Sequence, residues 1–196
     1  PSLHRLYSSE PPQTLADPTR PDLFYHLVSL PSSSSSAPPT QVYAVSFLSS
    51  SPPTPDSASV IGWLPAETEG AQEQDAGLND FRENSKFRVV MHRAIQEAIR
   101  EEADDVLKNG ALQLQYGWMH IHGEYPFPPF ESMHRRNIPA LGRIGDPDDI
   151  IASVLVEDSK ILPDTYQAMP SYRICTADGP TQLTEGLAQK LKTLLE

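Results

Sequence analysis

The sequence predicts an α+β fold, a two-layer sandwich in which a mainly antiparallel sheet packs against helices. Two observations lead to this prediction. Segments with strand character occur in two clusters of three, and each cluster is followed by one segment with helical periodicity, which gives the order βββ-α-βββ-α. Clustered strands separated by single helices are typical of antiparallel sheets, whereas strict alternation of strand and helix is typical of parallel ones.

The chain has 196 residues, enough for one domain with a substantial hydrophobic core. Residues 1–22 are expected to form an extended N-terminal tail, because prolines at positions 11, 12, 18 and 21 prevent a continuous helix. Residues 23–196 form the predicted single α+β domain.

The first cluster of predicted strands covers residues 23–30, 41–48 and 60–64, which are rich in aromatic and branched side chains. Two segments rich in proline and serine, 31–40 and 49–59, separate these strands and are expected to be loops. No helical pattern lies between the three strands, so they are predicted to form an antiparallel meander.

A helix is predicted from about residue 85 to residue 108, with Asn84 or Ser85 as its cap, or with an earlier start at Asp80 and Glu83. Gly110 follows as a left-handed C-terminal cap. Its apolar side chains recur at the spacing of a helix that lies on a core: Phe87, Val90, Met91, Ala94, Ile95, Ala98, Ile99, Val106 and Leu107.

The second cluster is predicted to contain strands at 111–122, 150–156 and 171–177, with a turn at 157–160 and a proline-containing connection at 161–170. Residues 123–149 form a long irregular loop, and a loop of that length in a compact domain usually has a function. A final helix is expected to begin near Pro180, with its apolar side formed by Leu183, Leu187, Leu191 and Leu194.

The composition argues against several classes of protein. The chain has 15 Lys and Arg residues against 26 Asp and Glu residues, a formal charge of −11, which disfavours nucleic acids and anionic lipids as partners. No apolar stretch approaches the roughly 18 residues that a membrane span needs. Cys175 is the only cysteine, which excludes an intrachain disulfide and fits a reducing compartment.

The first residues resemble a targeting signal. Arg5 lies two residues before Tyr7 and is followed by Ser8 and Ser9, a pattern similar to the Arg-x-Tyr/Phe-Ser pattern at which mitochondrial presequences are cleaved. The hypothesis is therefore import into the mitochondrial matrix with processing near Tyr7. An ordinary disordered tail on a cytoplasmic protein is the alternative.

Residues 117–130, GWMHIHGEYPFPPF, contain the most reactive set of side chains in the sequence. Strand alternation places His120, His122 and Glu124 on one face, continuing a face that begins at Leu112 as the core, and such a set can chelate zinc or iron. A third ligand is not evident at matching spacing among His26, His92 and His134. The preferred interpretation is structural histidines with no metal or other cofactor, and the alternative is a small metal-dependent or His-assisted enzyme.

Two further segments contain side chains that are typical of active or metal sites. Cys175 could act as a nucleophile beside a histidine, but an isolated cysteine is more often a small buried apolar residue. Residues 145–150, GDPDDI, bring three aspartates together, but they lack the later glutamate of a calcium loop and are expected to form a turn.

The long loop contains the predicted protein-binding residues. Aromatic and arginine side chains together are typical of protein interfaces, and those of the loop are Tyr125, Phe127, Phe130, Arg135 and Arg136. The alternative is that these aromatic rings cover the protein's own sheet. The function favoured by the sequence is a non-enzymatic protein-binding module, an accessory subunit or assembly factor of a mitochondrial complex.

Overall fold

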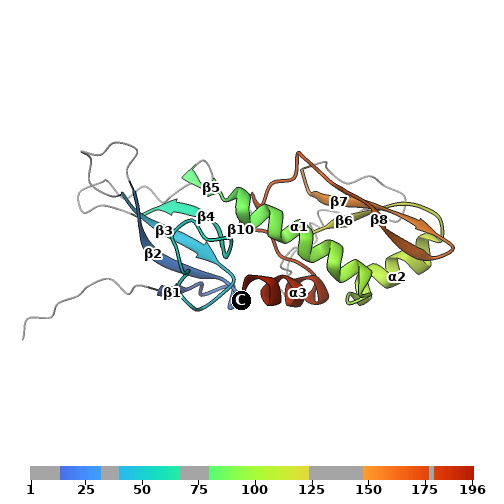
Figure 1. Ribbon diagram of the computed structural model, residues 1–196, viewed down its shortest axis with the longest axis horizontal. Helices are drawn as coiled ribbons and strands as arrows, with labels where there is room; N and C mark the ends of the chain where they lie inside the picture. Colours follow the sequence, from blue (N-terminus) through green and yellow to red (C-terminus); the bar gives the residue numbers. More distant parts are fainter. Residues whose placement is uncertain (1–13, 32–39, 67–79, 124–147, 177–178) are drawn as a thin grey trace, which may run out of the picture.

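The computed structural model describes residues 14–31, 40–66, 80–123, 148–176 and 179–196. It confirms the α+β class with mainly antiparallel sheets. The molecule is elongated, with a five-stranded sheet at one end, a three-stranded sheet at the other, and helix α1 (Ser85–Arg100) running between them (Figure 1). The strands therefore divide into two main sheets, a division that the order of elements alone does not reveal.

The five-stranded sheet is an antiparallel meander in the order β1-β2-β3-β4-β5. It contains the three strands predicted first in the sequence, and its members are β1 (Thr14–Ala16), β2 (Phe24–Leu30), β3 (Thr40–Ser46), β4 (Val60–Pro65) and β5 (Arg82–Glu83). Strand β1 belongs to the segment predicted as a tail, and it is extended because it pairs with β2. The Thr14 hydroxyl is hydrogen-bonded to the His26 ring at 3.0 Å, which helps to fix this pairing.

Helix α1 confirms the predicted amphipathic helix. Asn84 caps it, since its side chain accepts a hydrogen bond from the backbone N–H of Lys86. The buried face follows the predicted stripe and consists of Phe87, Met91, Ala94, Ile95, Ala98 and Ile99. These side chains belong to a buried cluster that also includes residues of both main sheets.

The prediction that this helix continues to residue 108 is wrong. Helix α1 ends at Arg100, and a second helix, α2, spans Asp105–Leu114. Asp104 is the N-cap of α2, because its side chain accepts a hydrogen bond from the backbone N–H of Leu107 at 2.9 Å. Gly110 consequently lies inside α2 instead of at a helix end. Of the two apolar residues predicted beyond the break, Leu107 is buried and Val106 is exposed.

The three-stranded sheet has the order β6-β7-β8 and consists of β6 (Gly117–His122), β7 (Ile150–Glu157) and β8 (Lys160–Ala168). The strand predicted at 111–122 is therefore half wrong, because its first residues belong to α2. The connection predicted at 161–170 is mostly strand β8. Pro163 does not prevent this, since β8 is an edge strand and needs hydrogen bonds on one side only.

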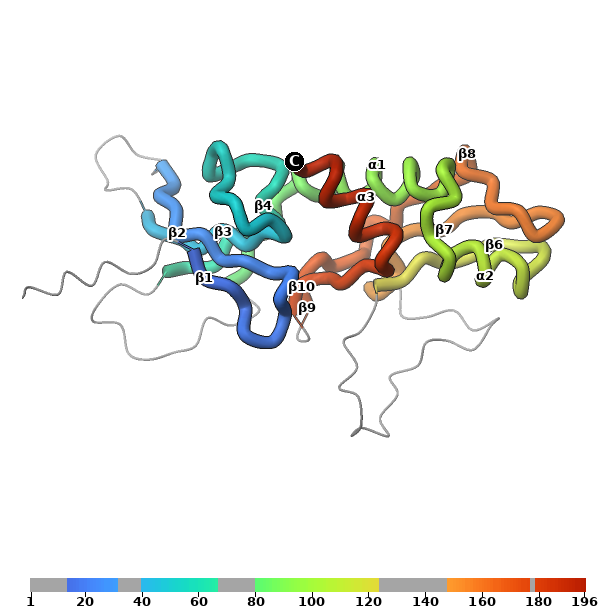
Figure 2. Tube along the Cα trace, turned by 90° about the horizontal axis from the view of Figure 1, so that it is seen from below, coloured from blue at the N-terminus to red at the C-terminus, as the bar shows by residue number. Residues whose placement is uncertain are grey.

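The last part of the chain returns along α1. The predicted strand 171–177 is reduced to β9 (Cys175–Thr176), which pairs with β10 (Gly179–Pro180). Helix α3 (Glu185–Leu195) begins later than Pro180 and runs antiparallel to α1, from the α1–α2 turn back toward the five-stranded sheet (Figure 2). The approach is close, because a Cβ atom on Gly186 would lie 2.5 Å from the carbonyl oxygen of Ala103.

No helix in the described parts of the chain is both long and apolar enough to cross a membrane.

Candidate functional site

The two histidines of β6 do not continue the core face. Met119 and Ile121 face the buried cluster, and Ile121 is 1% exposed. His120 and His122 lie on the opposite face, the same as that of the half-exposed Trp118. The prediction that the histidines extend a face beginning at Leu112 is wrong because Leu112 belongs to a helix.

His120 is held by a neighbour on the next strand. Its Nδ1 atom lies 2.8 Å from the Ser153 hydroxyl, and the two residues are directly paired across β6 and β7. This distance suits a nucleophile and its base, but the Ser153 side chain is buried, with 7% of the residue exposed. The contact therefore satisfies a cross-strand polar pair.

His122 is partly buried, and its ring centroid lies 6.3 Å from that of His120. Burial lowers the pKa of His122 and the nearby His120 adds to this effect, whereas Asp149 opposes it through its charge and a backbone hydrogen bond. A neutral imidazole is the form that binds metals. The pair therefore retains the chemistry of two potential ligands.

A third ligand is not placed beside them by the described residues. Glu124 and His134 lie outside these residues, His26 is bonded to Thr14 and the Leu48 carbonyl, and His92 to the Tyr166 hydroxyl. Within the described ranges, no group of three or more His, Cys, Asp or Glu side chains is positioned to hold a metal ion.

Cys175 lies at intermediate exposure in β9, and burial raises the pKa of its thiol. A raised pKa reduces the thiolate fraction at neutral pH, which disfavours a nucleophilic role. The aspartate-rich segment predicted as a turn is described only from residue 148, where Asp148 and Asp149 form a turn before β7.

All five predicted protein-binding residues, Tyr125, Phe127, Phe130, Arg135 and Arg136, lie outside the described residues. The region where α2 leads into β6 instead has exposed apolar side chains, which the sequence pattern did not predict. These are Leu112, Tyr116 and Trp118, which are 59%, 71% and 47% exposed. We call these three residues the junction surface.

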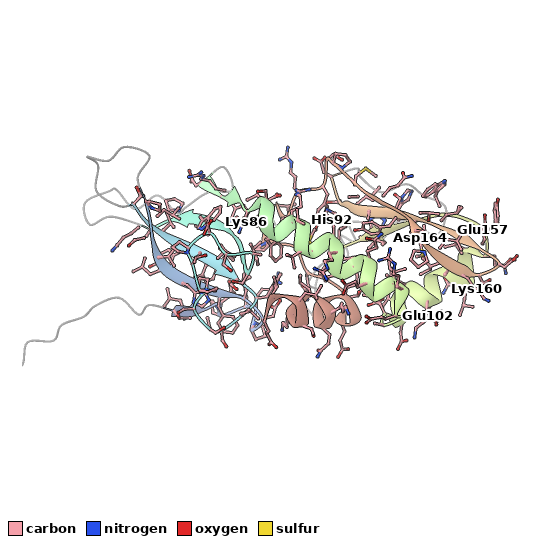
Figure 3. All side chains as sticks on the ribbon, viewed as in Figure 1. Lys86, His92, Glu102, Glu157, Lys160 and Asp164 are labelled. Atoms are coloured by element: carbon pink, nitrogen blue, oxygen red, sulfur yellow. The ribbon has the colours of Figure 1, made fainter. Side chains whose placement is uncertain are left out.

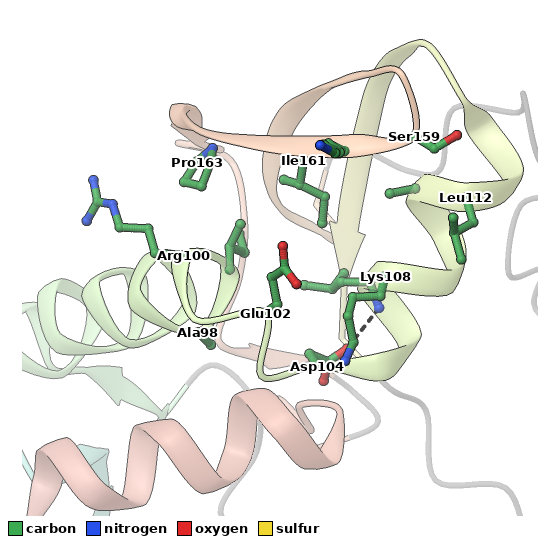
Figure 4. A pocket seen from close by; sticks show the side chains of 13 residues that line it. Ala98, Arg100, Glu102, Asp104, Lys108, Leu112, Ser159, Ile161 and Pro163 are labelled. Atoms are coloured by element: carbon green, nitrogen blue, oxygen red, sulfur yellow. Dashed lines mark hydrogen bonds between the residues drawn. The ribbon is translucent and has the colours of Figure 1, made fainter.

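A groove lies beside the junction surface, bounded by the end of α1, by α2 and by the β7–β8 hairpin (Figure 4). It encloses about 420 Å³ and has a mainly apolar lining: Ala98, Ile99, Leu107, Ala111, Leu112, Ile161 and Pro163. We call it the α1–α2–β8 groove. Leu112 belongs to both the groove and the junction surface.

Most charged groups around the groove are already occupied. Asp104 accepts a hydrogen bond from Thr184 at 2.5 Å, Arg100 lies 3.3 Å from Asp164, and Lys108 lies 2.6 Å from Asp105. Two further charged side chains, Glu102 and Lys160, are at the same end of the molecule (Figure 3).

Comparison with models of protein families, with curated protein sequences and with solved structures finds no match to this chain.

Proposed function

We propose that this chain is a non-enzymatic protein-binding module, an accessory subunit or assembly factor of a mitochondrial multiprotein complex. The junction surface is the observation that supports protein binding. Two aromatic rings and a leucine that remain exposed on a folded element lose little conformational entropy on association and bring large apolar areas to a contact. A side chain of the partner can insert into the α1–α2–β8 groove, which shares Leu112 with this surface.

The position of the junction surface supports this role. The backbone N–H of Ser159 in the β7–β8 turn donates to the carbonyl of Gln115 at 2.9 Å, and Gly117 begins a strand paired with β7. The exposed side chains are therefore attached to backbone that is held on both sides. A surface fixed in this way binds with a smaller ordering cost than a flexible loop.

Affinity purification of the endogenous chain, followed by mass spectrometry, tests the proposal. We expect a partner at a stoichiometric level, and we expect the double variant Tyr116→Ser and Trp118→Thr to lose it. Val89→Ser is the matched control, because Val89 is also apolar and 69% exposed but lies on α1. Failure of the wild-type chain to bring down any stoichiometric partner would refute the proposal.

The mitochondrial part of the proposal depends on the pattern from Arg5 to Ser9, outside the described residues. Microscopy of a full-length chain tagged at its C-terminus should show a mitochondrial signal, with processing near Tyr7 detected by mass spectrometry. A cytosolic signal with an intact N-terminus would remove this part and leave protein binding untouched.

The His120 and His122 pair supports a second candidate, a small metal-dependent or His-assisted enzyme that also uses Glu124. The supporting observation is that both rings lie on one strand face with the pKa of His122 lowered. Elemental analysis of protein prepared without metal-affinity resin distinguishes the candidates. We expect no stoichiometric zinc, iron or copper and no effect of a chelator on the melting temperature. One equivalent of metal, lost in His120→Ala, would make the enzyme the leading function.

A further inference from the structure

Glu102 has a backbone conformation that is unusual for a glutamate. Its φ of 51° lies in the left-handed region, one residue after the C-cap Glu101. The N–H of Glu102 donates to the carbonyl of Ile99 at 3.2 Å and that of Ala103 to the carbonyl of Ala98 at 2.9 Å, the paired bonds of a Schellman motif. Glycine is the usual residue at this position, because a Cβ atom makes the left-handed conformation unfavourable.

The charge of Glu102 is also unfavourable there. The C-terminus of a helix has a partial negative charge and favours cations, so a carboxylate immediately after α1 is repelled by it. In the part of the chain that the structure describes, the Glu102 side chain has no hydrogen bond and no cation within the 4.0 Å of an ion pair. Lys108 also lines the groove and feels the charge of Glu102, but its ammonium group is paired with Asp105 at 2.6 Å.

Two local costs that the charge of Lys108 offsets only in part are typical of functional residues. The Glu102 side chain points into the α1–α2–β8 groove, whereas Arg100 points away from it (Figure 4). The negative end of α1 and the Glu102 carboxylate therefore act together on anything that enters the groove. Both attract a cation.

The apolar lining limits what the cation can be. Ile99 and Leu107 are less than a tenth exposed and line the groove beside Glu102, with Ile161 on the β8 side. A small hydrated ion gains nothing from these side chains. The aliphatic stem of an arginine or lysine can lie along such a surface while its charged head reaches a carboxylate.

We propose that the α1–α2–β8 groove binds a basic, apolar segment of a partner protein, with an arginine or lysine stem on Ile99 and Leu107 and its head on Glu102. An apolar residue beside this cation contacts Leu112 on the rim. The inference rests on the proposed protein-binding function and names the chemistry of the partner. Lys160 lies on the β8 side of the groove, so the incoming cation is directed to the α1 side.

Selection of short random peptides on the immobilised full chain tests this partner chemistry. We expect enriched peptides to combine an arginine or lysine with a large apolar residue. The affinity of the synthesised peptides should fall about tenfold in Glu102→Gln, the loss of one hydrogen bond to a charged group. Glu157→Gln is the matched control, because it also removes one carboxylate, from an exposed position at the end of β7 that does not line the groove, and it should not weaken binding.

Enrichment of acidic peptides, absence of any enrichment, or equal affinity for wild type and Glu102→Gln would overturn the inference. Binding of the endogenous partner to the variants distinguishes failure of this inference from failure of the proposed function. A partner that depends on Tyr116 and Trp118 but still binds Glu102→Gln would preserve protein binding and refute the role of the groove. If wild type brings down no partner, the proposed function fails, whereas the peptide selection still reports on the groove.

Discussion

Replacement of Glu102 by glycine should stabilise the fold. A residue with a Cβ atom in the left-handed conformation costs about 1 to 2 kcal/mol, and φ at Glu102 is 51°. Glycine also makes the unfolded chain more flexible, which lowers the free energy of unfolding by about 0.4 to 1 kcal/mol and offsets part of this gain. Removal of a carboxylate from the end of α1 adds about 0.3 kcal/mol or more. The net expectation is a gain of about 1 kcal/mol in the free energy of unfolding.

Thermal and urea unfolding of Glu102→Gly and Glu102→Ala measure this gain. About 1 kcal/mol corresponds to a rise in melting temperature of about 2 to 4 °C for a chain of this size. Glu102→Ala removes the same charge but keeps the Cβ atom, so it should show only the small electrostatic part. If the two variants melt at the same temperature, the left-handed conformation does not store the free energy assigned to it.

Three further changes test other parts of the fold. Ile95→Asp places an unpaired carboxylate at a position that is 0% exposed and should destabilise by several kcal/mol, and an unchanged thermal melt would contradict the packing of α1. Gly186→Ala should lower the melting temperature, since the new Cβ would lie 2.5 Å from the Ala103 carbonyl oxygen; an equal or higher melt would show that α3 can shift freely. Hydrogen bonds from Arg20 lower the pKa of Asp22, so this carboxylate stabilises the fold above its unfolded pKa near 3.8 and ceases to do so as pH falls through the folded value. Asp22→Asn should therefore lose less stability than wild type on acidification below about pH 4, and parallel curves would exclude this contribution.

Local pattern was sufficient to predict the elements whose environment is simple. Helix α1 is amphipathic over its whole length, and its apolar positions from Phe87 to Ile99 are buried as predicted. The strands β2, β3, β4 and β7 were also identified, because each combines branched or aromatic residues with clear breakers at its ends.

The errors occur where tertiary contacts decide between local alternatives. The apolar spacing of α1 resumes at Val106 and Leu107, yet α1 ends at Arg100. Asp104 caps the next helix, and its carboxylate also accepts a hydrogen bond from Thr184, which is distant in the sequence. Pro163 indicated a connection, but the edge position of β8 removes the penalty. Neither the contact with Thr184 nor the edge position of β8 can be predicted from the residues that are adjacent in the sequence.

The groove could not be predicted for a related reason, since its walls come from α1, α2 and β8 and meet only in the folded chain. Glu102 itself appears unremarkable in the sequence, one acid among the four of EEADD at residues 101–105. Its positive φ angle distinguishes it from the other three acids. Stability measurements therefore report on the backbone conformation, and binding measurements report on the carboxylate. Glu102→Gly and Glu102→Ala both remove the carboxylate, so both should weaken the binding of a basic peptide. Only Glu102→Gly should also gain the larger stability that comes from relief of the left-handed conformation. Loss of binding in both variants, with a clearly larger stability gain in Glu102→Gly, would assign the strain to the backbone and the recognition to the charge.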